Sequence, residues 1–243
     1  MLPRRRPGVR DSHEPLVDRA RTGRQFEVVG NPGADGERGL QVISERIGPW
    51  VRRYTVVVGG VLAGWGLTPN ILTISGVILN GIVAIILGFG WLEVGGVCLL
   101  IASAFDMLDG AVARATNNIT PFGGFFDSTL DRYSEAVVYL GLLVYFFDTD
   151  DAKLGAILVF IAATGALLIS YARARAEAAG YKASVGLFAR TERVLLLALC
   201  LLIGQPLLAL WVLAVATHLT AITRIVHVWR ASLQEPAPSS GPR

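Results

Sequence analysis

Residues 106–131 have the sequence DMLDGAVARATNNITPFGGFFDSTLD, in which two pairs of aspartates flank a short polar link. Asp106 and Asp109 are three residues apart, and Asp127 and Asp131 are four residues apart, so each pair lies on one face of a helix. The polar link and the proline that follows it predict that one helix ends there and another begins. The segment therefore predicts a helical hairpin that brings four carboxylates together.

The stretches on either side of this hairpin are apolar, as is the chain as a whole. Its 243 residues are 53% hydrophobic and 17% charged, and the mean hydropathy is +0.52. A soluble domain has about 25% charged residues. The composition excludes a secreted disulfide scaffold, a disordered acidic chain and an ordinary soluble enzyme. It favours an all-α integral membrane protein, with Cys98 and Cys200 as apolar filler rather than ligands.

The pattern of apolar runs predicts six transmembrane helices preceded by an interfacial amphipathic helix within residues 40–66. The six spans are expected at 69–90, 92–116, 121–147 and 154–178, and on either side of the Gly-Gln-Pro break at 204–206 in the apolar run 194–223. The membrane domain then covers residues 40–232. Residues 1–39 and 233–243 are predicted to be disordered tails, the first of them cytoplasmic.

The distribution of basic residues gives the expected orientation. Of the 22 Lys and Arg residues, only Lys153 falls in a loop on the side opposite the N-terminus. Because basic residues concentrate on the cytoplasmic side of membrane proteins, we expect a multi-pass protein of the cell membrane. Both termini and the aspartate cluster are then cytoplasmic.

Four carboxylates facing one another in a medium of low dielectric constant cannot all stay ionised without positive charge. Divalent cations supply that charge, and carboxylates without neighbouring His or Cys favour Mg²⁺ or Mn²⁺. Such ions suit phosphate chemistry. Gly110, Ala113 and Gly123 lie between the pairs and allow a flat ligand to come close, and Arg114 is placed to meet a phosphate.

The arrangement D-x₂-DG-x₂-AR-x₈-G-x₃-D-x₃-D resembles the complete signature of the CDP-alcohol phosphotransferase family. The six-span pattern over residues 40–232 is similar to that family too. The resemblance implies an enzyme that binds a CDP-lipid, such as CDP-diacylglycerol, at the cytoplasmic face of the bilayer. A hydroxyl of the acceptor alcohol then attacks the lipid-side phosphorus, and CMP leaves.

The same resemblance implies roles for the signature residues. Two Mg²⁺ (or Mn²⁺) ions would be held by Asp106, Asp109 and Asp127, with Asp131 partly shared, and Asp131 would be the general base. Gly110, Ala113, Arg114 and Gly123 would bind the CDP-lipid. Members of the family are homodimers, and no nucleic acid is expected as a partner.

A second cluster of basic residues bears on the acceptor alcohol. So many cations favour a phosphorylated polyol, because arginine binds phosphate in a bidentate fork. The segments 170–178 and 190–193 resemble bacterial phosphatidylinositol-phosphate synthases, with Arg173 in place of a common Lys and Thr191 in place of Pro. The resemblance implies inositol phosphate as acceptor, and its phosphate would be held by Ser170, Arg173, Thr191, Arg193 and Arg224.

Three alternatives stay open. A related enzyme that uses glycerol phosphate would share the aspartate signature. A membrane prenyltransferase also uses Mg²⁺-bound aspartates, but its two acidic motifs are far apart in the sequence, whereas these four lie within 26 residues. A cation transporter predicts carboxylates near the midplane of the bilayer and symmetric repeats of broken helices, and no internal repeat is visible here.

Overall fold

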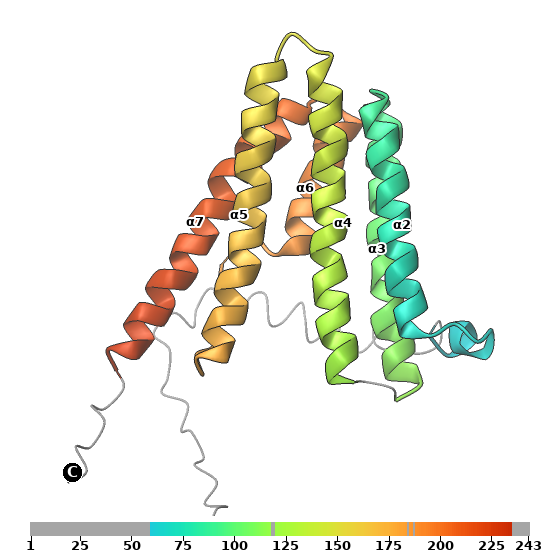
Figure 1. Ribbon diagram of the computed structural model, residues 1–243, viewed down its shortest axis with the longest axis vertical. Coiled ribbons are helices and arrows are strands. Elements are labelled where there is room, and N and C mark those ends of the chain that lie inside the picture. The colour runs from blue at the N-terminus through green and yellow to red at the C-terminus, as the bar shows by residue number, and fades with distance from the viewer. Residues whose placement is uncertain (1–58, 118–119, 184, 187, 235–243) are drawn as a thin grey trace, which may run out of the picture. The chain divides into compact units, whose positions relative to one another are not determined.

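The computed structural model describes residues 59–117, 120–183, 185–186 and 188–234. Within these residues the chain is helical and contains no strand, which confirms the predicted all-α class. The main helices are α2 (Pro69–Gly88), α3 (Leu92–Ala115), α4 (Pro121–Phe147), α5 (Ala152–Ala178), α6 (Arg190–Leu202) and α7 (Pro206–Ser232) (Figure 1). Residues 59–64 are also helical. Most of the predicted interfacial helix, the N-terminal tail and residues 235–243 lie outside the described residues.

Local sequence signals fix where the helices begin. The Thr68 hydroxyl accepts a hydrogen bond from the Ile71 amide at 3.4 Å, and the Thr120 hydroxyl accepts one from the Gly123 amide at 3.0 Å. Each threonine is followed by a proline, which suits the first position of a helix because its missing N–H needs no partner there. Gly204 has a φ of +65° in the turn between α6 and α7, as its place in the predicted break requires.

Six main helices among the described residues lie where the six spans are predicted, but their lengths differ. In the same described part of the chain, four helices are long and apolar enough to cross a membrane by themselves: α2, α3, α5 and α7. The helix α4 has 27 residues, but its N-terminal part carries Asp127, Asp131, Arg132 and Glu135. The helix α6 has only 13 residues, so it is about 20 Å long against a hydrocarbon core of about 30 Å. The count of six full spans therefore stays a prediction.

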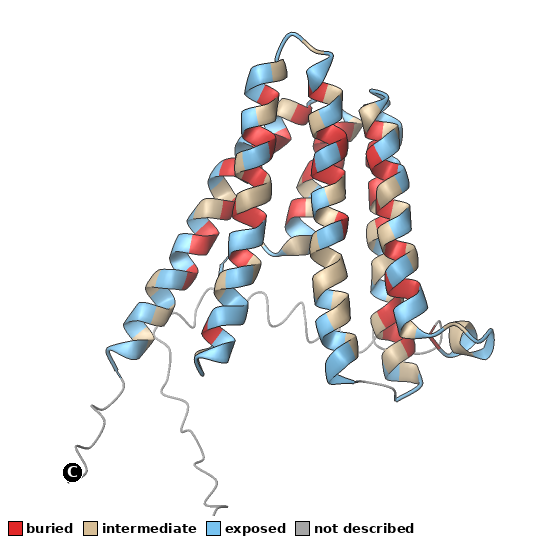
Figure 2. Cartoon of the chain, viewed as in Figure 1, coloured by how far each residue is buried: buried red, intermediate tan, exposed pale blue. Residues whose placement is uncertain are grey.

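Each of the six main helices packs against two others, so that the contacts form a closed ring. The helix α2 contacts α3 and α4, and the helix α5 contacts α4 and α7. The helix α6 packs more extensively against α3 than against α7. Figure 2 shows that the buried residues lie mainly on the helix faces turned toward neighbouring helices. Leu87, Leu142, Phe146 and Leu213 are almost fully buried there.

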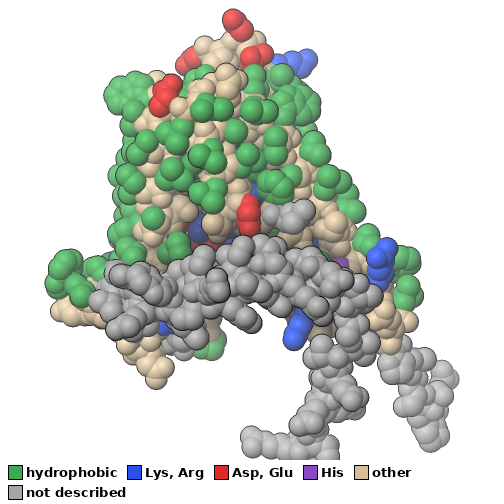
Figure 3. Space-filling view, turned by 180° about the vertical axis from the view of Figure 1, so that it is seen from behind, with side chains coloured by type: hydrophobic (Ala, Val, Ile, Leu, Met, Phe, Trp, Pro, Cys, Tyr) green, Lys and Arg blue, Asp and Glu red, His purple; other side chains and the backbone are tan. Residues whose placement is uncertain are grey.

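Large apolar side chains also cover the outside of the bundle. Ile78 is 60% exposed and Phe160 is 71% exposed, and Figure 3 shows hydrophobic side chains over much of the face that it draws. In water so large an apolar surface would lead to aggregation, whereas in a bilayer it faces lipid tails. The exposed surface thus agrees with membrane insertion of the described helices.

The helices α2 and α4 come close together at Gly141, and this contact supplies a test of the packing. A Cβ atom built on Gly141 would lie 2.4 Å from the carbonyl oxygen of Ala84. We expect Gly141→Ala to push α4 away from α2 and to destabilise the protein by about 1–3 kcal/mol. Thermal unfolding in detergent should show a lower Tm. Gly81→Ala on α2 is the control, because nothing lies within 4 Å of its added Cβ. An equal Tm for both variants would contradict the close packing.

Candidate active site

The hairpin of α3 and α4 joins the four aspartates in two cross-helix pairs. Asp109 from α3 and Asp127 from α4 line one pocket, which has a volume of about 470 Å³. Asp106 and Asp131 are connected by the side chain of Arg190, the first residue of α6. The sequence prediction that the two helices bring these side chains together is therefore consistent with the structure.

Arg190 forms short ion pairs with two aspartates of the cluster. Its Nη2 lies 2.6 Å from Asp106 Oδ2, and its Nη1 lies 2.8 Å from Asp131 Oδ1. One guanidinium group thus bonds to a carboxylate on each arm of the hairpin. Arg132 approaches Asp131 less closely, at 3.6 Å, from a more exposed position. These contacts offset part of the mutual repulsion of the carboxylates.

The helix α2 positions the two aspartates of α3. The Thr73 hydroxyl donates a hydrogen bond of 2.9 Å to Asp109 Oδ2, and the Gly110 amide donates to Asp109 Oδ1. Gly76 lies against the other carboxylate, since a Cβ atom built there would be 2.2 Å from Asp106 Oδ1. The positions of the two α3 carboxylates therefore depend on α2. The Thr73 hydroxyl holds Asp109, and the absence of a side chain at Gly76 leaves room for Asp106.

The pocket beside Asp109 and Asp127 contains every residue that the sequence assigned to the CDP-lipid. Its wall is formed by the ends of α2, α3 and α4, with the exposed Arg114 side chain close to Gly110. The lining residues are Thr68, Pro69, Asn70, Thr73, Asp109, Gly110, Ala113, Arg114, Thr120, Gly123, Gly124 and Asp127. Carboxylates, small residues and one arginine around a cavity of this size suit a phosphorylated ligand bound with cations.

The donor set fits a hard divalent ion, because carboxylate oxygens are the ligands that Mg²⁺ and Mn²⁺ prefer. Nevertheless, in the part of the chain that the structure describes, no three His, Cys, Asp or Glu side chains form a group that could hold a metal ion. Arg190 bridges Asp106 and Asp131 instead. The residues are of the right kind, but a positively charged side chain already bonds to two of them.

The residues assigned to the acceptor phosphate are not gathered in one cavity. Ser170 and Arg173 line a second, larger pocket of about 940 Å³ between α4 and α5, together with Arg132. Arg193 and Arg224 are buried elsewhere, and Thr191 is exposed. The assignment of these five residues to one phosphate stays a prediction.

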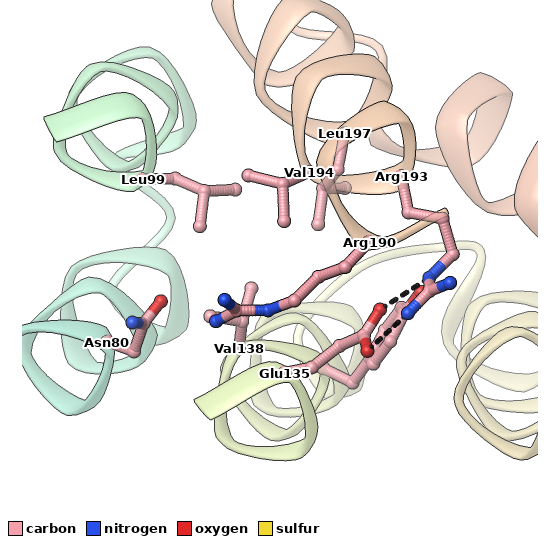
Figure 4. Close-up of a pocket in the computed structure, with 9 residues that line it drawn as sticks. Asn80, Leu99, Glu135, Val138, Arg190, Arg193, Val194 and Leu197 are labelled. Atoms are coloured by element: carbon pink, nitrogen blue, oxygen red, sulfur yellow. Dashed lines mark hydrogen bonds and ion pairs between the residues drawn. The ribbon is translucent and has the colours of Figure 1, made fainter. Parts of the chain in front are cut away.

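Arg193 and Arg224 already have partners within the protein. The Nε and Nη2 atoms of Arg193 each donate to a Glu135 oxygen at 2.7 Å (Figure 4). Its Nη1 donates to the Phe188 carbonyl at 2.9 Å. Arg224 donates to the carbonyls of Val185 and Ile169 at 3.0 and 2.7 Å. In this structure both arginines connect helices and the segment before α6.

Comparison with known proteins decides the family. The family model described as CDP-alcohol phosphatidyltransferase matches residues 66–227. The chain belongs to the CDP-alcohol phosphatidyltransferase family. A relative in Pyrococcus horikoshii, named archaetidylinositol phosphate synthase, is 32% identical over 181 residues, which cover 74% of this chain and 93% of the relative. The sequence resemblance is thereby confirmed, and the protein is an enzyme of this family.

Solved structures of a phosphatidylinositol phosphate synthase from Mycobacterium tuberculosis have the same fold as this phosphatidyltransferase. The structure with CDP-DAG bound is 30% identical, has a TM-score of 0.68, and the match covers 79% of this chain and 99% of the other. The complex with manganese and citrate is 32% identical, has a TM-score of 0.69, and the match covers 78% and 97% of the two chains. A donor lipid and a divalent metal are thus present in structures of a relative.

Sequence reasoning missed three residues of the site. Thr73, Gly76 and Arg190 contact the aspartates, but they are far from them in the sequence, up to 84 positions away for Arg190. In the sequence, Arg190 belongs to the basic segment 190–193 that is expected near the acceptor. Nothing in the residues around it indicates that its partners are Asp106 and Asp131.

The contact between Gly76 and Asp106 can be tested by adding one methyl group. We expect Gly76→Ala to displace the Asp106 carboxylate, because its Oδ1 atom lies within the space of the new Cβ. Phosphatidyltransferase activity should fall at least tenfold, roughly what a misplacement of the site by a fraction of an ångström causes. Turnover is measured at equal amounts of folded protein. Gly81→Ala on the same helix should keep wild-type activity, and equal activities of the two variants would count against the contact.

Proposed function

We propose that this enzyme transfers a phosphatidyl, or analogous lipid phosphate, group from a CDP-lipid such as CDP-diacylglycerol to a hydroxyl of inositol phosphate, with release of CMP. The observation that carries the proposal is the pocket in which Gly110, Ala113, Arg114 and Gly123 surround a carboxylate from each arm of the hairpin. A relative of the same fold has been solved with CDP-DAG bound. The names of relatives in archaea and bacteria support inositol phosphate as the acceptor.

The ions that the proposal requires are two Mg²⁺ or Mn²⁺. Asp106, Asp109 and Asp127 would hold them, with Asp131 partly shared, and manganese in the solved relative supports this class of metal. When bound, such ions offset the charge of the diphosphate and stabilise the leaving CMP. Thr73 and the Gly110 amide orient Asp109 by hydrogen bonds to its two oxygens, each of which keeps a lone pair for an ion.

The transfer step needs a base and a leaving group. The acceptor hydroxyl oxygen forms a bond to the lipid-side phosphorus while the bond from that phosphorus to the oxygen of the CMP phosphate breaks. The electron pair of the broken bond leaves with CMP, and Asp131 accepts the proton of the hydroxyl. Asp131 lies four residues after Asp127 on α4, so both side chains lie on one helix face. Arg114 would bind a phosphate of the donor from the edge of the pocket.

The acceptor would enter from the larger pocket between α4 and α5. Arg132, Ser170 and Arg173 line this pocket, and its volume of about 940 Å³ accommodates a phosphorylated polyol. Arg173 is exposed and bonds to Glu177 at 2.8 Å, an ion pair that contributes little by itself and is easily exchanged for a phosphate. The proposal also includes cytoplasmic termini, a cytoplasmic active site and a homodimer, the last on family grounds alone.

An acceptor screen tests the proposed substrate. Purified enzyme in detergent receives CDP-diacylglycerol, Mg²⁺ and radiolabelled inositol phosphate or glycerol phosphate in separate reactions. We expect label in the lipid fraction and release of CMP with inositol phosphate. If only glycerol phosphate were incorporated, the acceptor would be glycerol phosphate rather than inositol phosphate, and the proposed type of reaction would still hold. If no acceptor released CMP, the transfer reaction itself would be wrong, as a cation transporter predicts.

The proposed base is tested by Asp131→Asn. We expect turnover to fall roughly 10²–10⁴-fold, because the amide cannot accept the proton. Binding of Mn²⁺ and of CDP-diacylglycerol should be largely retained through the other three aspartates. The measurements are initial rates of CMP release and direct binding of Mn²⁺. Asp150→Asn, in the turn between α4 and α5, is the matched control and should behave as wild type. If Asp131→Asn turned over as fast as wild type, Asp131 would not be the general base.

A further inference from the structure

We propose that Arg190 is a resident counter-cation of the aspartate cluster, which a divalent ion must displace before Asp131 is free to act. The proposal rests on the proposed function in one respect, namely that divalent ions bind these carboxylates. It assigns to Arg190 a regulatory role in metal loading rather than a contact with substrate.

The guanidinium group of Arg190 lies between two carboxylates of the aspartate cluster. Its two terminal nitrogens bond to Asp106 and Asp131 at 2.6 and 2.8 Å, so it occupies the space between the two carboxylates. An ion shared by these aspartates needs the same oxygens. Two unit charges of equal sign about 4 Å apart repel strongly wherever water is scarce. The guanidinium and the ion are therefore alternatives at this position.

In the described part of the chain, Arg190 has no bond outside the cluster that would hold its Nε, whereas all three side-chain nitrogens of Arg193 have partners. Arg193 lies one turn further along α6 and donates from Nε and both terminal nitrogens to Glu135 and the Phe188 carbonyl. Arg190 Nε is buried and has no hydrogen-bond partner among the described residues. Figure 4 shows the Arg190 side chain extended past Val138, away from the Glu135–Arg193 pair. Among the described residues, the ion pairs and hydrogen bonds of Arg190 are thus those to Asp106 and Asp131. Their loss would leave the side chain free to move.

Displacement of Arg190 has a consequence for Asp131. Its Oδ1 is paired with Arg190 Nη1, and the guanidinium fills the space beside the proposed base as long as the arginine remains. An ion that displaces Arg190 takes over this oxygen and opens that space, so that an acceptor hydroxyl can approach the other oxygen of the carboxylate. Metal loading and availability of the base are then one event, which would keep the metal-free enzyme from activating an acceptor hydroxyl.

The inference predicts that removal of Arg190 strengthens metal binding. The test titrates metal-free full-length protein with Mn²⁺ and follows bound Mn²⁺ by electron paramagnetic resonance or calorimetry. We expect Arg190→Gln to bind Mn²⁺ at least tenfold more tightly than wild type, because the competing cation is gone. Arg190→Lys keeps a positive charge that can still compete, and it should lie between the two.

Thermal stability supplies a second readout that does not depend on activity. In EDTA, Arg190→Gln should have a lower Tm than wild type, because the paired carboxylates lose their counter-charge. In saturating Mn²⁺ the difference should close, so that Mn²⁺ raises the Tm of the variant more than that of wild type. Recovery of the Tm also shows that the variant folds.

Arg175→Gln is the matched control. It removes the same charge from an exposed position near the end of α5, away from the residues bonded to the aspartates. Its Mn²⁺ affinity should stay within about twofold of wild type, so a general charge effect is distinguished from competition.

Unchanged or weaker Mn²⁺ binding by Arg190→Gln would overturn the inference while leaving the proposed transfer reaction in place. Failure of all variants and of wild type to bind Mn²⁺ would overturn both this inference and the metal dependence of the proposed function. The acceptor screen described above separates these cases, because it reads the transfer reaction directly.

Discussion

The structure depends on one electrostatic constraint: two adjacent membrane helices present four carboxylates that cannot remain close together without positive charge. Two carboxylates about 4 Å apart repel by roughly 4 kcal/mol even at an effective dielectric constant of about 20. That energy is comparable to the whole stability of many domains. The protein meets the constraint with Arg190 from a third helix and with a hydrogen bond from Thr73 on a fourth. The site therefore depends on four helices rather than on the hairpin alone.

The same constraint explains the contrast between the two ends of the bundle. The core of Leu87, Leu142 and Phe146 is apolar and tightly packed, as the direct contact of Gly141 with the Ala84 backbone illustrates. Among the buried polar residues, Asp109 lines the pocket shared with Asp127, and Arg193 and Arg224 bond to groups of neighbouring segments. Apolar packing around Leu87, Leu142 and Phe146 thus holds the helices together. This packing allows the charged groups around Asp109 to stay close to one another.

Much of this arrangement follows from local patterns in the sequence. The helix starts at Thr68 and Thr120, the break at Gly204 and the pairing of the aspartates come from signals within a few residues of one another. Gly110 and Gly123, which line the pocket beside Asp109 and Asp127, are likewise recognisable from the local signature. The roles of Thr73, Gly76 and Arg190 could not be predicted, because they arise only when distant helices pack. The end of α6 follows from the predicted break at 204–206, whereas its beginning at Arg190 lies four residues before the predicted apolar run 194–223.

The shortness of α6 has a consequence for how two unlike reactants meet. Figure 1 shows α6 beginning part-way along the neighbouring helices, so the segment that connects it to α5 reaches inward beside the bundle. Backbone that is not helical is tolerated at such depth only next to protein or in a hydrated vestibule. If the enzyme acts as proposed, a sugar phosphate, which cannot enter hydrocarbon, needs such an aqueous path, whereas a diacyl substrate would come from its own leaflet. The short helix would then make the place where the two substrates meet amphiphilic.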